Sequence, residues 1–277
     1  MQRLGIRTSF SFLIFLLIFS LIAACFSFFA LREDPSAALS DESTEETDPI
    51  TVILDAGHGG EDGGASSASG ILEKDLNLSI TFLLKDFLEA NGIRVVMTRT
   101  DDRLLYDTSV DYNGRKKALD LAARKKIGEE TPNSIFVSIH MNAYPQTQYS
   151  GLQVWYSPNH EDSKAIADNI QNTVQELLQP ENNRRIKPAT SSIYLLHRLK
   201  SPAVLVECGF LSNEAEAARL SSPEYQKELA FCLILAISQH LNPQNRGFSQ
   251  KYREKRLHST QRYGKMREES NTRRRPI

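Results

Sequence analysis

Three short apolar runs, each leading to a side chain that can bind a metal or move a proton, constrain this fold most strongly. Residues 51–54 precede His58, residues 135–139 precede His140, and residues 203–206 precede Glu207. Runs of this length that are rich in β-branched residues predict buried strands. Because open α/β sheets place their sites at the carboxyl ends of such strands, we expect His58, His140 and Glu207 to share one centre.

Helical patterns alternate with these runs. Apolar side chains recur at helical spacing from Leu76 to Leu88, and Asn91-Gly92 provides a C-terminal cap. We expect helices at 73–90, 113–127, 161–178, 214–220 and 223–241. We expect strands at 51–55, 93–98, 134–139, 151–156, 192–196 and 203–207, with 151–156 at an edge. This alternation predicts an α/β three-layer sandwich, with a mixed central sheet of about six strands flanked by helices.

The N-terminus predicts export. Arg3 and Arg7 precede the almost wholly apolar residues 10–31, which are long enough to cross a bilayer as a signal-anchor helix. The basic side predicts that residues 1–9 stay in the cytoplasm. A cleaved signal peptide is an alternative, and Cys25 after Ile22-Ala23-Ala24 leaves a lipoprotein processing site open. All three interpretations place the rest outside the cytoplasm, either membrane-anchored or cleaved and secreted.

The charge of residues 32–277 changes along the chain and divides them into three segments. Residues 32–49 are acidic and rich in Ser and Thr, which predicts a linker, and residues 50–242 form the expected catalytic domain. Residues 243–277 carry eleven Lys/Arg against three Asp/Glu and have no apolar periodicity, which predicts a disordered tail. This basic tail is either simply solvated or attracted to anionic wall polymers or lipid headgroups. An exported domain is not expected to meet nucleic acid.

The candidate residues fit zinc hydrolysis. Catalytic zinc usually keeps three protein ligands and one open position, and His58, Glu73 and His140 would supply them. Zinc lowers the pKa of its water, and a second carboxylate, Glu207, would move the proton. Structural roles remain open at each position. Glu73 is stabilised at a helix N-terminus without any metal, and either histidine could be a hydrogen-bonded strand-edge residue.

Four motifs carry a family resemblance: Leu54-Asp55-Ala56-Gly57-His58-Gly59-Gly60, Glu73-Lys74-Asp75-Leu76-Asn77-Leu78, Phe136-Val137-Ser138-Ile139-His140-Met141-Asn142-Ala143 and Pro202-Ala203-Val204-Leu205-Val206-Glu207-Cys208-Gly209-Phe210-Leu211-Ser212-Asn213. Together, over residues 50–241, they resemble the zinc-dependent N-acetylmuramoyl-L-alanine amidases of the amidase_3 family. The resemblance implies one Zn²⁺ on His58, Glu73 and His140, with Glu207 as the catalytic glutamate. It implies peptidoglycan as substrate, cleaved between the lactyl group of N-acetylmuramic acid and L-alanine of the stem peptide.

The layout resembles one subfamily in particular. The chain has no recognisable wall-binding repeat, and one ordinary amphipathic helix is expected between His140 and Glu207. The germination-specific amidases, which act in spore cortex maturation before muramic-δ-lactam forms, share this layout. A vegetative amidase for cell separation or autolysis, a zinc peptidase of the stem peptide and a non-catalytic peptidoglycan-binding regulator remain alternatives. A regulator should lack one of His58, Glu73, His140 and Glu207, and all four are present.

Several polar residues have alternative roles. Asn142 could position substrate or satisfy loop backbone. Arg185, in the basic segment 183–187, could meet carboxylates of the substrate or remain solvated. We expect Arg99 and Arg124 to be structural ion-pair residues.

Overall fold

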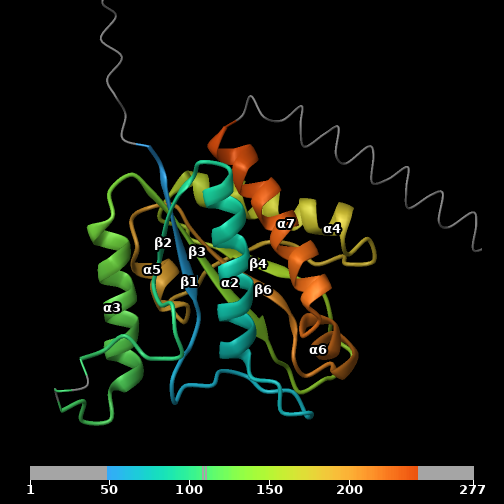
Figure 1. The fold of residues 1–277 in the computed structure, drawn as a ribbon, viewed down its shortest axis with the longest axis horizontal. Coiled ribbons are helices and arrows are strands. Elements are labelled where there is room, and N and C mark those ends of the chain that lie inside the picture. Colours follow the sequence, from blue (N-terminus) through green and yellow to red (C-terminus); the bar gives the residue numbers. More distant parts are fainter. Residues whose placement is uncertain (1–48, 108, 110, 243–277) are drawn as a thin grey trace, which may run out of the picture. The chain divides into compact units, whose positions relative to one another are not determined.

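The computed structural model describes residues 49–107, 109 and 111–242 of the 277 in the chain. Within them, six strands form one sheet with helices on both faces (Figure 1). The signal-anchor predicted at 10–31, most of the acidic linker and the basic tail lie outside the described residues. Among the helices that the structure describes, none is both long and apolar enough to span a bilayer.

The sheet is mixed, in the order β2-β1-β3-β6-β4-β5. Its strands are β1 (Thr51–Ala56), β2 (Arg94–Met97), β3 (Ser134–Asn142), β4 (Gln153–Tyr156), β5 (Lys187–Pro188) and β6 (Ala203–Phe210). The helices are α2 (Glu73–Ala90), α3 (Lys116–Glu130), α4 (Glu161–Leu177), α5 (Tyr194–Arg198), α6 (Glu214–Leu220) and α7 (Pro223–Leu241). Strands β2, β1, β3 and β6 are parallel, and β4 runs antiparallel to β6. The predicted three-layer α/β architecture is confirmed.

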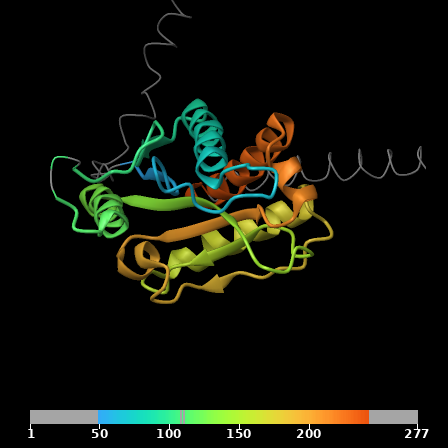
Figure 2. The ribbon, with the colours of Figure 1, turned by 90° about the horizontal axis from the view of Figure 1, so that it is seen from below.

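Alternation along the strands separates two cores. In β1, Val52 and Leu54 join the cluster made with α2, α4 and α7, whereas Ile53 joins the one made with α3 and α5. Successive strand residues point to opposite faces, so a strand buried on both sides reads as a continuous apolar run. Figure 2 shows the sheet between α2 on one side and α5 on the other. The short apolar runs are therefore central strands.

The order of strands creates a crevice. From β1 the chain passes through α2 to β2 on one side, and α3 then returns it to β3 on the other side of β1. The two helices cover opposite faces of the sheet, so their connections diverge at the carboxyl ends of β1 and β3. Ligand sites of open α/β sheets lie at such a topological switch point. His58 lies two residues after the end of β1, and His140 lies near the end of β3.

Two expectations were wrong. The strand at 151–156 is not an edge, because the two-residue β5 pairs with its outer side. The strand expected at 192–196 is instead the helix α5. Leu195 and Leu196 of α5, together with Leu199 just after it, have the spacing of one helical face, and they bury against Phe136 and Ala203. Consequently two helices, rather than one, lie between His140 and Glu207.

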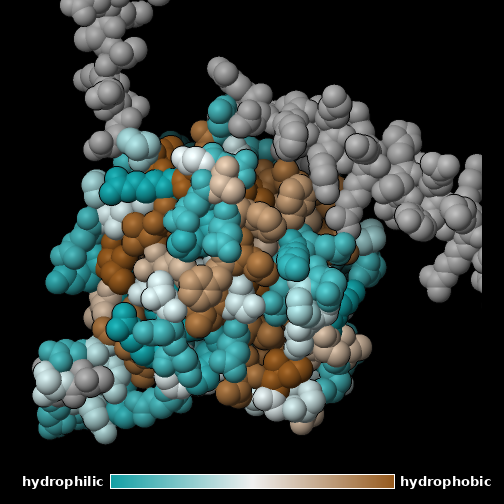
Figure 3. Space-filling model, in the orientation of Figure 1, coloured by the Kyte–Doolittle hydropathy of each residue, from teal (hydrophilic) through white to brown (hydrophobic). Residues whose placement is uncertain are grey.

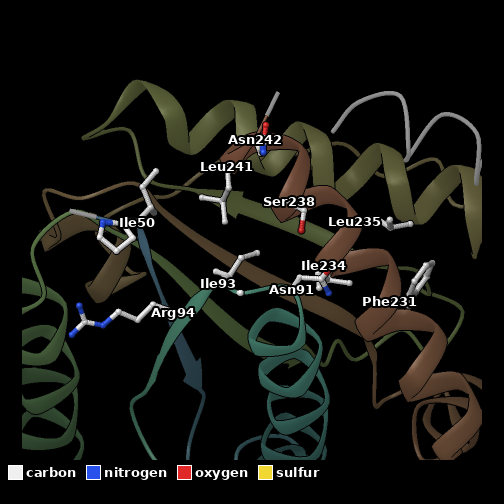
Figure 4. Close-up of a pocket in the computed structure, with 12 residues that line it drawn as sticks. Ile50, Asn91, Ile93, Arg94, Phe231, Ile234, Leu235, Ser238, Leu241 and Asn242 are labelled. Atoms are coloured by element: carbon white, nitrogen blue, oxygen red, sulfur yellow. The ribbon is translucent and has the colours of Figure 1, made fainter. Parts of the chain in front are cut away.

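A hollow lies far from the crevice. It is lined by Ile50, Ile93, Arg94, Ile234 and Leu241, where β1 and β2 begin and α7 ends (Figure 4). Apolar side chains also show between hydrophilic ones on the face that carries α2 and α7 (Figure 3). Because this hollow is at the amino ends of the strands, it is separate from the predicted site.

Candidate metal centre and active site

Two histidines and a glutamate come together at the switch point. His58 Nε2 lies 3.2 Å from Glu73 Oε1, and His140 Nδ1 lies 2.9 Å from the same oxygen. One ligand atom from each residue lies within 4.8 Å of the others. The Glu73 side chain is buried, whereas those of His58 and His140 are 16% and 20% exposed. This group could hold a metal ion that remains accessible from solvent.

His58 lies in a strained turn. Its φ of 62° is in the left-handed region, which non-glycine residues seldom adopt, and Gly59 and Gly60 continue the positive φ values. The carbonyl oxygen of His58 accepts a hydrogen bond from Arg124 at 2.7 Å. Its Nδ1 lies 2.9 Å from Asp62 Oδ2. The outer nitrogen thus faces a carboxylate, as in metal-binding histidines.

Two glycines leave room for the ligands. A Cβ on Gly57 would lie 2.3 Å from the ring of His140, and one on Gly64 would lie 2.5 Å from Glu73 Oε2. Both contacts are shorter than side chains tolerate. The glycines of the His58 loop are therefore required for close packing around the cluster as well as for its turns.

Glu73 is held as a carboxylate. Its Oε2 accepts a hydrogen bond from the Ala65 amide at 2.7 Å, and its Oε1 accepts one from the Met141 amide at 3.0 Å. Burial alone would raise the pKa of Glu73, but hydrogen bonds and charge from His140 and His58 outweigh it and hold the pKa far below its usual value. Conversely, Glu73 and Asp62 raise the pKa of His58 despite its burial.

Glu207 lies beside the cluster on the next strand. It is directly opposite His140 in the pairing of β6 with β3. Its Oε2 is buried and has no hydrogen-bond partner among the described residues. Burial raises the pKa of Glu207 to about 7. A buried carboxyl group that titrates near neutral pH can both accept and donate a proton, as a general acid–base residue must.

A buried ion network braces the crevice. Arg124 contacts Asp55 at 2.6 Å and Asp120 at 2.7 Å, which confirms its structural ion-pair role. Arg99 instead donates hydrogen bonds to backbone carbonyls, including those of Ala56 and Gly57. Both arginines therefore fix the chain just before His58.

The two candidate substrate residues are placed differently. Asn142 lies at the end of β3 and lines a hollow next to Glu207 and His140. The Arg185 side chain is exposed, and its backbone carbonyl accepts a hydrogen bond from Gln153. The neighbouring residue Arg184 lines the hollow instead.

Asp62 was missed by sequence reasoning. It follows His58 by four residues, and Gly59 and Asp62 exchange backbone hydrogen bonds that close the loop between them. The sequence signal is an acidic residue in a Gly-rich turn right after a candidate ligand. Such a residue can orient the ring from the side away from the metal.

Similarity to known proteins extends across this domain. The sequence profile of the family described as "N-acetylmuramoyl-L-alanine amidase" matches residues 52–239, more than half of the chain. The germination-specific N-acetylmuramoyl-L-alanine amidase of Bacillus subtilis is 37% identical over 67% of this chain and 77% of its own length. A probable cell wall amidase, LytH of Staphylococcus aureus, is 30% identical over 70% of this chain and 60% of its own length.

Solved structures share the fold. The CwlD amidase of Clostridioides difficile, solved in complex with the GerS lipoprotein, has a TM-score of 0.66 and 40% identity, and the match covers 69% of this chain and 98% of that one. The amidase AmiC2 of Nostoc punctiforme has a TM-score of 0.59 and 30% identity, over 69% and 97%. The chain belongs to the N-acetylmuramoyl-L-alanine amidase family.

Proposed function

We propose that this amidase hydrolyses the amide between the lactyl group of N-acetylmuramic acid and L-alanine of the stem peptide, with zinc held by His58, Glu73 and His140. One observation carries the proposal: a histidine–glutamate–histidine group lies beside a buried glutamate on the adjacent strand. The family match supports the choice of bond.

The donor set fits zinc. Four-coordinate zinc sites of hydrolases use two imidazoles and a carboxylate at about 2.0–2.2 Å, so ligand atoms lie roughly 3.3 Å apart. The separations of 3.2 and 2.9 Å to Glu73 Oε1 are close to this value. The nitrogens that face Glu73 are Nε2 of His58 and Nδ1 of His140. We infer that these atoms are the ligands.

The chain's own residues would carry the proton. Bound zinc would polarise the scissile carbonyl and lower the pKa of a water molecule. Glu207 accepts a proton from the attacking water and passes it to the amine of L-alanine as the C–N bond breaks. Burial raises the pKa of Glu207 to about 7, so both proton transfers are feasible near pH 7. Asp62 orients the His58 ring during the cycle.

The experiment uses the full chain in detergent with purified peptidoglycan. Mass spectrometry of the soluble fraction should find free stem peptides that begin at L-alanine. Chelation should abolish them, and zinc should restore them. Fragments cut within the stem would indicate a peptidase instead. Peptidoglycan binding without any cleavage by the zinc-loaded chain would indicate a regulator.

We also propose a role in spore cortex maturation. Support comes from the similarity to the germination-specific amidase and to CwlD. Expression in a spore former that lacks its germination-specific amidase should restore muramic-δ-lactam to the cortex. The similarity to LytH keeps a vegetative wall role as the alternative. That alternative predicts that no muramic-δ-lactam is restored. It also predicts that stem peptides are released faster from vegetative sacculi than from cortex.

We propose that the enzyme acts outside the cytoplasm, held at the membrane by residues 10–31. The proposal rests on the apolar sequence after Arg3 and Arg7, and on peptidoglycan as substrate. Protease added to intact protoplasts should remove the catalytic domain. Fractionation with the cytosol would contradict this location, and release into the medium would indicate cleavage of the anchor.

A further inference from the structure

A second hollow, of about 420 Å³, opens beside the proposed catalytic centre. Asn142, Tyr149, Gln153, Trp155, Arg184 and Lys187 line it, together with Tyr144 and Phe210. Two cationic side chains and four aromatic ones meet here, with no carboxylate in the lining. The Tyr144 and Tyr149 side chains are exposed at its mouth. An anionic ligand with some apolar surface would fit these walls.

Arg184 is fixed in place. Its Nε donates a hydrogen bond to the Ser150 carbonyl at 2.7 Å, and its guanidinium lies 4.3 Å from the centre of the Phe210 ring. Its Nη1 lies 3.4 Å from Gln153 Oε1. These contacts occupy part of the guanidinium and leave donors on it, because arginine carries five N–H groups. A fixed guanidinium is well suited to a planar carboxylate.

Neither cation of the hollow forms a direct ion pair with a described residue. Among the described residues, no carboxylate lies within ion-pair distance of Arg184 or Lys187. The Lys187 ammonium lies 5.3 Å from the centre of the Trp155 ring. By contrast, Arg124 and Lys74 are both paired with aspartates. Glu216 interacts electrostatically with Arg184 without a direct ion pair. The hollow therefore carries positive charge that is only partly compensated.

The pairing of the strands fixes how far this hollow lies from His140 and Glu207. Asn142 follows His140 by two residues on β3, and Gln153 lies directly opposite Glu207 on β4. Strand geometry places Asn142 about 7 Å from His140 along β3. It places Gln153 about 5 Å from Glu207 across to β4. In a peptidoglycan stem, the residue after L-alanine is a γ-linked D-glutamate whose α-carboxyl group is either free or amidated. That group is only a few bonds from the scissile amide.

We propose that the hollow is a stem-peptide subsite in which Arg184 and Lys187 bind this free carboxylate. The proposal rests on the proposed amidase function, because it places the leaving peptide on the β4 side of Glu207. It makes the enzyme select stems with an acidic second residue over amidated ones. Tyr144 and Tyr149 would cover the peptide that extends from it.

The test compares two synthetic muropeptides that differ only in a free or amidated α-carboxyl group on the second residue. Zinc-loaded full-length enzyme should have a kcat/KM about tenfold or more higher for the free acid, as expected for charge-assisted hydrogen bonds. Arg184→Gln and Lys187→Gln should each reduce this preference, mainly through KM. Lys187→Glu should bring the ratio of kcat/KM for the free acid to kcat/KM for the amide below one. Lys187 is exposed, so its variants should fold normally.

Two further variants define the specificity of the effect. Lys164→Gln removes an exposed cation on α4 and should leave the preference unchanged. Arg185→Gln tests the adjacent arginine, whose side chain does not line the hollow. Equal cleavage of both substrates by the wild type would overturn the subsite and leave the amidase function intact. A larger loss of the preference for the free acid in Arg185→Gln than in Arg184→Gln would also overturn the subsite. Cleavage of neither substrate would overturn both proposals.

Discussion

Glu207 lies directly opposite His140 in the parallel pairing between β6 and β3. Neighbouring strands are about 4.8 Å apart, and directly paired residues share a face of the sheet. The backbone pairing itself therefore sets the spacing between the proposed proton acceptor and a proposed ligand. Gln153, opposite Glu207 on β4, extends the same row. The register of the sheet, rather than a flexible loop, positions these three side chains.

Glu207→Gln should abolish most activity without loss of zinc. General acid–base residues contribute about 10²–10⁴-fold, so the rate of stem release should fall by that order. The amide has nearly the same shape, and zinc stoichiometry and melting temperature should match the wild type. Glu181→Gln, at a side chain that is 68% exposed, is the matched control. Loss of zinc in Glu207→Gln would assign this residue to the metal instead.

His58→Ala should remove zinc-dependent stabilisation. A ligand present at 100 times its Kd stabilises the folded state by about 2.7 kcal/mol, which raises the melting temperature by several degrees. With only Glu73 and His140 left, the affinity for zinc should fall and the temperature shift should disappear at the same zinc concentration.

The control for that experiment is His197→Ala, which removes an exposed histidine of α5. Its zinc-dependent shift should equal that of the wild type, as measured by thermal unfolding with and without chelator. An undiminished shift in His58→Ala would contradict the proposed ligand set.

Much of the site could be predicted from the sequence because three of its residues follow short apolar runs, although β3 and β6 continue past His140 and Glu207. His58, His140 and Glu207 each follow a buried run, and parallel strands bring their carboxyl ends to one edge of the sheet. The helix that begins at Glu73 was predicted with the bounds seen in the structure. Strong periodicity in long elements therefore carried the prediction.

Short elements were less predictable. Arg184 and Arg185 are adjacent in sequence, and only the actual backbone conformation decides which one lines the hollow. The strand β5 after them has two residues, too few to give a periodic signal. Residues 192–196 read as a strand because they include Ile193, Tyr194 and two leucines, and tertiary burial instead decided for the helix α5.

Gly57→Ala should disrupt the metal centre from a position that binds nothing itself. The new Cβ would collide with the His140 ring at 2.3 Å, so the imidazole must shift from its present position beside Glu73. We expect at least a tenfold weaker affinity for zinc, measured by competition with a chromogenic chelator, with a parallel loss of activity.

Gly63→Ala is the matched control for that variant. It lies in the same loop, and its nearest contact would be an ordinary 3.7 Å to Leu72. Its zinc affinity should stay within about twofold of the wild type, since structural changes of this size at open positions are usually neutral. An equal loss of affinity in both variants would show that loop flexibility, not the space at His140, is what matters.

Asp55→Asn should destabilise the fold. Asp55 and Arg124 are both almost fully buried, and they contact each other at 2.6 Å. Removal of one partner from a buried ion pair typically costs about 3–5 kcal/mol, because the other charge is left uncompensated. The exposed pair of Asp101 with Arg103 offers a contrast, and Asp101→Asn should cost less than about 1 kcal/mol. Urea unfolding at pH 7 measures both, and equal costs would contradict the structural role of the buried pair.

The same aspartate makes stability depend on pH. Burial alone would raise the pKa of Asp55, but the charge of Arg124 and the hydroxyl of Ser138 outweigh it and hold the pKa below its usual value of 3.8. A carboxyl whose pKa is lower in the folded state contributes stability that is fully present above pH 3.8 and is lost as pH falls through the folded-state pKa. The difference in unfolding free energy between wild type and Asp55→Asn should therefore be constant from pH 7 to about pH 5 and should shrink below about pH 4. Urea titrations of both proteins with chelator present would measure this difference without any contribution from metal release. A difference that stays constant down to pH 2 would mean that Asp55 stabilises the fold through its shape and hydrogen bonds rather than through its charge.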